Sequence, residues 1–175
     1  MTVRVALLLR GVNVGGVTVR SADLRSVLTD AGLGDVTTVL ASGNAVVTAT
    51  SASAAAKTAE AALEAKYGRR IRVLGIAIDA LQRIVDEYPH GEDAEHTPYV
   101  VFELEPGVTK ELAGLEPGEG EAIAAGDGVV HWSNPKGTTL SSPFAKALER
   151  TAKDRVTTRN LRTLRKVLAA APPAG

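Results

Sequence analysis

The sequence has no cysteine and few aromatic residues, and both absences narrow the functions that the protein can have. Without cysteine the chain of 175 residues can form no disulfide, no thiolate metal site and no cysteine nucleophile. Phenylalanine, tryptophan and tyrosine together make up 3% of the residues, too few for a surface of stacked rings of the kind that binds single-stranded nucleic acid. Hydrophobic residues make up 45%, so alanine, valine and leucine must fill the core.

Long hydrophobic runs are also absent from the sequence. None approaches the roughly 20 residues that a membrane-spanning helix needs. The apolar run near the N-terminus, Val5–Leu9, ends at Arg10 and is too short for the core of a signal peptide. We therefore expect a cytoplasmic protein with no membrane partner.

The net charge is zero, but the charges are unevenly distributed along the chain. Residues 86–127 contain twelve acidic side chains and one lysine, whereas residues 141–175 contain eight basic and two acidic side chains. These regions either neutralise each other across the fold or leave the basic end to face an anionic partner. The neutral total argues against a dedicated duplex-DNA binder, for which a basic domain is expected.

Hydrophobic periodicity and turn residues predict the order strand, helix, strand, strand, helix, strand for the first half of the chain. The two middle strands are joined by Ser42-Gly43-Asn44, which suits a tight hairpin turn. Ser21 is the expected N-cap of the first helix, and Gly68 the expected end of the second. The predicted elements are strands at 3–9, 36–40, 45–50 and 71–78, and helices at 22–31 and 52–67.

The second half repeats part of this order. After a helix at 79–88 it is expected to contain strands at 99–104, 121–125 and 129–132, and helices at 109–115, 143–153 and 160–171. The order βαββαβ is that of the split βαβ, or ferredoxin-like, fold, and the second half matches all of it except the last strand. We therefore predict an α+β protein of two ferredoxin-like subdomains, residues 1–80 and 81–175, with mixed or antiparallel sheets.

The connectivity of a split βαβ unit brings three of its turns to the same edge of the sheet. The N-terminus of the first helix, whose free amides favour negative charge, lies at that edge as well. Arg10, Arg69 and Arg70 should gather there, so we predict a site for an anion or a phosphate. Alternatively, the glycines of the loop only shape a winding connection. In the first half the three turns are the loop 10–20, the hairpin 42–44 and the turn 68–70.

Other chemical motifs are poorly supported. The glycines at 11, 15 and 16 lack both the ending of a phosphate-binding P-loop and the spacing of a dinucleotide fingerprint. His90, His96 and His131 show no paired ligand spacing, so no metal site and no cofactor are expected. Ser42 does not stand in the glycine-flanked turn of a serine hydrolase. The acidic residues near 92–95 and 116–121 have the pattern of solvated loops.

The last predicted helix begins in a basic, polar stretch. Thr157 and Thr158 are expected to cap it, which places Arg159 and Asn160 in its first turn. These two residues form either a second group of donors, for phosphate or for the other subdomain, or part of a solvated basic face.

Three stretches of the sequence resemble a bacterial family catalogued as domain of unknown function 1697. They are Leu-Arg-Gly-Val-Asn-Val-Gly-Gly at 9–16, Ala-Ser-Gly-Asn at 41–44 and Thr-Thr-Arg-Asn-Leu-Arg-Thr at 157–163. The resemblance implies an α+β fold with two ferredoxin-like halves, and it implies no reaction. The chain departs from the usual family pattern at Tyr88-Pro89-His90, at Ser141-Ser142 and at Leu161.

We therefore expect a small binding protein that recognises an anionic ligand: a nucleotide, a phosphate or an RNA backbone. The alternatives are an enzyme acting on a phosphorylated small molecule and an oligomerising structural module without a ligand. A homodimer is the oligomer that we expect. The absence of an evident base or nucleophile near the donors favours binding over catalysis. The predicted ligand-binding residues are Arg10, Asn13, Gly15, Gly16, Ser42, Asn44, Arg159 and Asn160.

Overall fold

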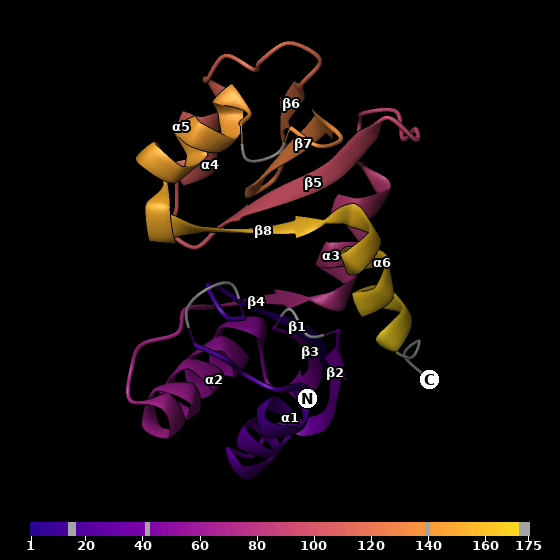
Figure 1. Cartoon of the computed structure of the whole chain (residues 1–175). Coiled ribbons are helices and arrows are strands. Elements are labelled where there is room, and N and C mark those ends of the chain that lie inside the picture. Colours follow the sequence, from indigo (N-terminus) through magenta and orange to yellow (C-terminus); the bar gives the residue numbers. More distant parts are fainter. Residues whose placement is uncertain (14–16, 41–42, 139–140, 172–175) are drawn as a thin grey trace. The chain divides into compact units, whose positions relative to one another are not determined.

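The computed structural model of the protein describes residues 1–13, 17–40, 43–138 and 141–171 (Figure 1). By its contacts the chain divides into two units. The first contains Met1–Arg83 and the C-terminal residues from Arg165, and the second contains Ile84–Leu164. Each unit has a four-stranded sheet whose neighbouring strands are all antiparallel. The α+β fold predicted from the sequence is therefore confirmed.

The first unit has the complete βαββαβ order that its sequence predicts. The elements are β1 (Val3–Leu9), α1 (Ser21–Asp30), β2 (Gly34–Val39), β3 (Asn44–Ala49), α2 (Ala52–Tyr67) and β4 (Val73–Ala77). The strands lie in the order β2-β3-β1-β4. Helix α3 (Ile78–Asp86) follows β4, and the boundary between the two units falls within it.

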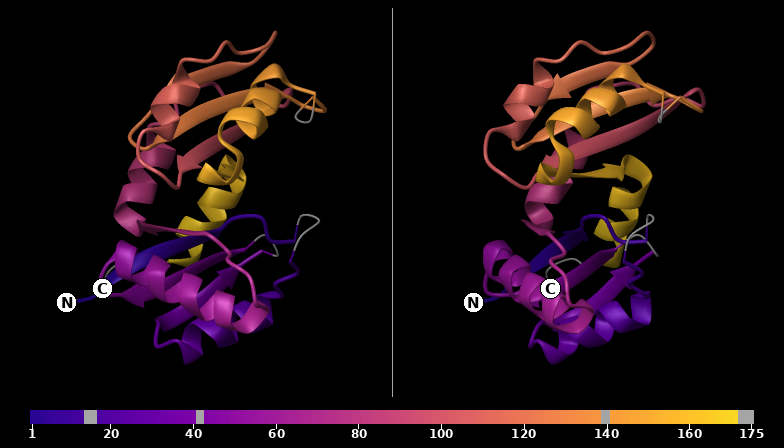
Figure 2. Two further views of the ribbon diagram at one scale, coloured as in Figure 1. Left: turned by 90° about the vertical axis from the view of Figure 1, so that its left-hand side faces the viewer. Right: turned by 60° about the vertical axis from the view of Figure 1, so that its left-hand side comes forward.

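Helices α1 and α2 cover one face of this sheet (Figures 1 and 2). Alternate residues of β1 point to that face, because side chains of a strand alternate between its two sides. In α2 the buried residues recur every four positions, which keeps them on one side of the helix. The resulting core contains Val5, Leu7 and Leu9 of β1, Leu24 and Leu28 of α1, and Ala55, Ala59 and Leu63 of α2.

Helix α2 is tied to strand β4 at two points. Near the start of the helix, Gly75 lies so close to Ala52 that an added Cβ atom would collide with the Ala52 carbonyl oxygen and lie 3.0 Å from its carbonyl carbon. Further along, a carboxylate oxygen of Glu60 accepts a hydrogen bond from the Val73 amide at 2.8 Å. Because β4 is an edge strand, these two contacts hold the helix against the border of the sheet.

The ends of the two helices differ in how well the sequence predicts them. At the start of α2 the Ser51 hydroxyl accepts a hydrogen bond from the Ala54 amide, a cap that the sequence analysis did not name. Gly68 ends the helix with φ of 71°, as predicted. The prediction of Ser21 as the N-cap of α1 is wrong. Arg20 occupies that position without a capping side-chain hydrogen bond, and the Ser21 hydroxyl donates to the Leu40 carbonyl at 3.2 Å. The N-terminal amides of α1 thus have no side-chain cap among the described residues.

The second unit repeats the topology of the first. Its elements are β5 (His96–Glu103), α4 (Val108–Ala113), β6 (Ala122–Ala125), β7 (Val129–Pro135), α5 (Pro143–Thr151), a 3-10 turn (Lys153–Arg155), β8 (Val156–Asn160) and α6 (Leu161–Ala170). The strands lie in the order β6-β7-β5-β8, the same arrangement as β2-β3-β1-β4. A boundary between the units falls within α6 as well.

Strand β8 corrects the prediction that Thr157 and Thr158 cap the last helix. Both threonines belong to the strand, which pairs with β5 so that Arg159 lies opposite Val100. The helix begins one residue later than predicted, at Leu161, and it is Asn160 that caps it: its Oδ1 accepts a hydrogen bond from the Arg162 amide at 2.8 Å. The second unit therefore completes the βαββαβ order.

Trp132 lies at the centre of the second unit's core. It is 2% exposed, stacks on Tyr99 with ring centroids 4.8 Å apart, and meets Phe144 of α5 edge to face. Its indole N–H donates to a carboxylate oxygen of Glu121 at 2.8 Å. Glu121, predicted to belong to a solvated loop, is instead half-buried and fixes the orientation of the indole. The same core includes Leu112, which brings α4 against the face that α5 covers.

Candidate functional site

The structure brings the predicted turns of the first unit to one edge of its sheet. Strands β1 and β2 end there, and β3 and β4 begin there. The Leu9 amide donates to the Gly43 carbonyl at 2.9 Å, and the Arg10 amide donates to the Arg72 carbonyl at 2.9 Å. The loop after β1 therefore lies beside both the hairpin and the segment that leads into β4, as the connectivity predicts.

Asn13 closes the loop after β1. It has φ of 60°, in the left-handed region that asparagine tolerates better than most residues. Its side-chain nitrogen donates to the Val19 carbonyl at 3.0 Å, and its side-chain oxygen accepts from the Val19 amide at 2.8 Å. Both ends of the side-chain amide thus fix the path of the loop into α1. Asn13 therefore has a structural role in addition to its predicted role as a ligand donor.

The hairpin packs tightly against the same loop. Gly43 has φ of 75°, and an added Cβ atom would lie 2.5 Å from a methyl group of Val12. Asn44 is fully buried, and its side-chain nitrogen donates to the Val39 carbonyl at 3.2 Å across the turn. The glycine thus permits the close approach of the loop, and the asparagine holds the hairpin closed. Gly15, Gly16 and Ser42, which were also predicted as ligand-binding residues, lie outside the described residues.

Arginines border this edge. Arg20, Arg69 and Arg70 are exposed, and Arg10 and Arg72 are half-buried. We call these five residues the arginine edge. Aspartate and glutamate are absent from the chain segments that carry them, 10–20 and 68–72, and from the hairpin segment 40–44. Sequence reasoning identified three of the five and missed Arg20 and Arg72, although each lies within or beside a segment that it had placed at the edge.

The charge of the two units is opposite in sign. The first unit has twelve lysines and arginines against six acidic residues, whereas the second has eight against fourteen. The first unit therefore carries a net charge of +6 and the second of −6. The basic excess belongs to the unit that contains the arginine edge, and this favours approach of an anion to that unit.

Arg159 and Asn160 belong to the second unit, where both have local partners. One guanidinium nitrogen of Arg159 donates to the Thr157 hydroxyl at 2.8 Å and to the Thr158 carbonyl at 2.9 Å. Burial lowers the pKa of Arg159 to about 10. Arg159 therefore braces strand β8 and does not stand in the first turn of a helix, where the sequence placed it.

Sequence reasoning missed a buried cluster around His131 of β7. This residue is 3% exposed, and its Nδ1 atom has no hydrogen-bond partner in the part of the chain that the structure describes. The ring of Tyr88 meets it edge to face, and His90 Nε2 donates to the His131 carbonyl at 3.1 Å. Burial raises the pKa of Tyr88 to about 12, so its hydroxyl stays protonated and donates to the Trp132 carbonyl at 2.7 Å.

The titration of His131 gives a first prediction. Burial lowers the pKa of His131 below 6.5, nearby His90 lowers it further, and the Glu87 carboxylate acts in the opposite direction. Below pH 6.5 the unfolded chain takes up a proton before the folded protein does, so stability should fall as the pH drops toward the folded pKa. The slope from this one residue is at most about 1.4 kcal/mol per pH unit.

Urea denaturation at pH 7.5 and 5.5, with His131→Phe as the comparison, measures this effect. The wild type should lose more stability between the two pH values than the variant, which has no group to protonate at this position. The hydrogen bond to Asp93 raises the pKa of the exposed His96. Because His96 is present in both proteins, its contribution to the pH dependence cancels when the two are compared. Equal pH dependence in the two proteins would contradict the prediction.

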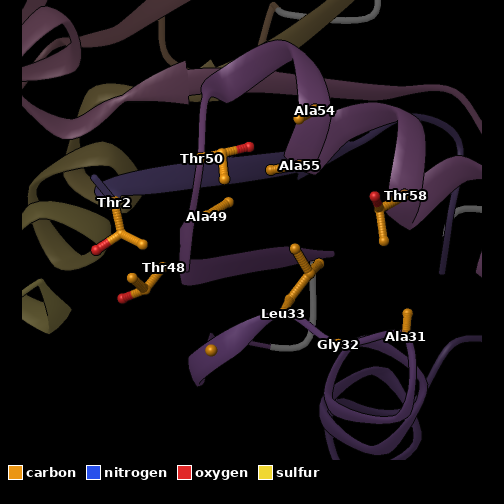
Figure 3. A pocket seen from close by; sticks show the side chains of 11 residues that line it. Thr2, Ala31, Gly32, Leu33, Thr48, Ala49, Thr50, Ala54, Ala55 and Thr58 are labelled. Atoms are coloured by element: carbon orange, nitrogen blue, oxygen red, sulfur yellow. The ribbon is translucent and has the colours of Figure 1, made fainter.

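A pocket of about 380 Å³ lies at the opposite edge of the first sheet (Figure 3). It is formed where α1 ends, β2 begins, β3 ends and α2 begins. Thr58 of α2 and Ala31 after α1 point toward each other across it. No lining residue is charged, so the pocket is separate in place and in chemistry from the arginine edge. Its polar side chains are those of Thr2, Thr48, Thr50 and Thr58.

The described residues contain no group of three or more His, Asp or Glu side chains placed to hold a metal ion. None of the helices in this part of the chain is long and apolar enough to cross a membrane.

Comparisons with known proteins support the fold and the family. The chain is similar to the structure of conserved bacterial protein SP0830 from Streptococcus pneumoniae, with a TM-score of 0.76 and 23% sequence identity over 97% of this chain and 98% of that one. None of the curated proteins compared with it matches. The family described as protein of unknown function, DUF1697, matches residues 1–131. With three quarters of its length matched in this way, the chain belongs to the DUF1697 family.

Proposed function

We propose that this protein binds a phosphate-bearing anion at the arginine edge of its first unit. The observation that supports the proposal is the gathering of Arg10, Arg20, Arg69, Arg70 and Arg72 along one sheet edge whose segments contain no acidic residue. Guanidinium groups present several N–H donors in a planar fork that matches the oxygens of a phosphate. The N-terminal amides of α1, which have no side-chain cap among the described residues, lie at the same edge, where the Asp23 carboxylate in the first turn offsets part of their positive field.

The composition of this edge supports binding rather than catalysis. The segments 10–20, 40–44 and 68–72 contain no Asp, Glu, His, Cys or Lys. General acid–base catalysis needs a side chain that gains or loses a proton near neutral pH, and an arginine does not do so. An enzyme acting on a phosphorylated molecule here would have to obtain such a group from another part of the chain.

Titration with inorganic phosphate, pyrophosphate and a mononucleotide tests the proposal. We expect the backbone amide signals of Gly11 and Gly68, at the arginine edge, to shift in nuclear magnetic resonance spectra at millimolar ligand. The signal of Gly32, beside the uncharged pocket, should stay in place. The absence of any shift at the edge would contradict the proposal.

Paired substitutions distinguish binding at a specific site from attraction by the net charge of the unit. Arg69→Ala with Arg70→Ala should weaken binding about tenfold or more, since each charge-assisted hydrogen bond contributes roughly 1.5 kcal/mol or more and 1.4 kcal/mol is a factor of ten. The matched control removes two exposed cations from helices of the same unit, Arg25→Ala with Lys57→Ala. Equal weakening by both pairs would show that only net charge attracts the anion.

A further inference from the structure

We infer that the anion bound by the arginine edge is the backbone of a single-stranded nucleic acid, held through a row of phosphates. This inference rests on the proposed function and specifies its ligand. Neither the fold nor the family assigns such a ligand. It follows from the width of the edge, from the separation of its cations and from the residue types that the edge lacks.

The arginine edge spans the whole width of the first sheet. Arg20 precedes Ser21, whose hydroxyl donates to Leu40 at the end of the outermost strand β2. At the other side, the Arg72 carbonyl accepts from the Arg10 amide where β4, the opposite outermost strand, begins. Four strands with neighbours about 4.8 Å apart place the two sides roughly 14 Å from each other. This width exceeds a single phosphoryl group and suits several phosphates in a row.

The cations lie at two sides of this width rather than at one point. Arg20 lies beside the end of β2, whereas the segments of Arg10 and Arg72 meet where β4 begins. Among the exposed cations, Arg20 comes from the loop before α1, and Arg69 and Arg70 come from the turn between α2 and β4. The glycine pattern of a loop that wraps one phosphate with consecutive backbone amides is absent from the sequence. An extended chain of phosphates can reach the exposed cations at both sides of the edge, which a single phosphate cannot.

The edge provides no surface on which bases can stack. Its three segments contain no phenylalanine, tryptophan or tyrosine. The one aromatic residue of the first unit, Tyr67, packs against the core formed by the sheet and its helices. Recognition therefore depends on the backbone charge, which makes binding insensitive to base sequence and strongly dependent on salt.

A single strand fits the charge of this chain better than a duplex does. A duplex carries about one negative charge for each 1.7 Å of its axis, twice the density of one of its strands. The second unit of the same chain has a net charge of −6 and would repel that denser field more strongly. A strand of lower charge density is repelled less.

Fluorescence anisotropy of the full chain with a labelled oligothymidylate of about a dozen nucleotides tests the inference. We expect binding at least about tenfold tighter than that of a mononucleotide, and similar affinity for oligoadenylate and oligouridylate of the same length. The logarithm of the association constant should fall with the logarithm of salt concentration by about 0.7 for each phosphate contact. Arg69→Ala with Arg70→Ala should lower this slope, whereas Arg25→Ala with Lys57→Ala should leave it unchanged.

The other outcomes overturn either this inference alone or the inference together with the proposed function. If a mononucleotide or inorganic phosphate binds as tightly as the oligonucleotide, the inference fails and the proposed anion site stands. Tighter binding of a duplex, or of inorganic polyphosphate, would also overturn the assignment of a single strand. If none of these anions binds, the proposed function fails together with the inference.

Discussion

Gly75→Ala should destabilise the first unit by about 3 kcal/mol or more, the upper end of what added atoms cost in a packed core. The new Cβ atom would collide with the carbonyl oxygen of Ala52 and lie 3.2 Å from the Ala56 side chain. The colliding atom belongs to the backbone of α2, so no side-chain rotation relieves the contact. Helix α2 would have to move away from strand β4, where Leu63 and Val73 share one core.

Urea denaturation monitored by circular dichroism measures this loss. Gly91→Ala is the matched control, because a Cβ atom at Gly91 would meet no atom within 4 Å. That variant should stay within about 0.5 kcal/mol of the wild type, as substitutions away from packed features do. A loss for Gly75→Ala no larger than that for Gly91→Ala would show that α2 can shift at little cost.

Trp132→Ala should cost about 3 to 5 kcal/mol of stability, the range found when a large buried aromatic side chain is removed from a core. The substitution would remove the ring that contacts both Tyr99 and Phe144, and it would leave the Glu121 carboxylate without the indole donor. Losing the donor adds to the cost of the cavity, because a half-buried carboxylate is left with less compensation for its desolvation.

Trp132→Phe separates the two contributions. It retains a ring in the core but removes the indole N–H, so it should lose clearly less stability than Trp132→Ala. The chain has one tryptophan, so unfolding of both variants must be followed by circular dichroism rather than by tryptophan fluorescence. Equal losses in the two variants would mean that the hydrogen bond to Glu121 outweighs the packing of the ring.

The sequence predicts most of the fold because local signals and connectivity agree. In the first unit, β-branched and apolar runs bounded by glycine predict all four strands, and the split βαβ order then determines which strands are neighbours. Strand β8 was missed for the opposite reason. Val156–Asn160 is short, polar and placed at the edge of a sheet, and its register comes from pairing with β5, a contact distant in sequence.

The candidate site was predictable in position but not in detail. Connectivity alone places the loop after β1, the hairpin and the turn before β4 at one edge. The partners of Asn13 and Asn44 could not be predicted, because the two amides bond to main-chain groups of Val19 and Val39 whose positions depend on the loop path. The burial of His131 was equally hidden, since it depends on Tyr88 and His90 lying against β7.

The hydrogen bond between Glu60 and Val73 has a consequence for the behaviour of the protein in solution. An edge strand presents outward-pointing amides to which a strand of another molecule can add, and this is a route to aggregation. In β4 the outward amide of Val73 is already occupied by a side chain of the same unit. The bond that fastens a helix to its sheet thus also occupies one of the edge amides with which a foreign strand could pair.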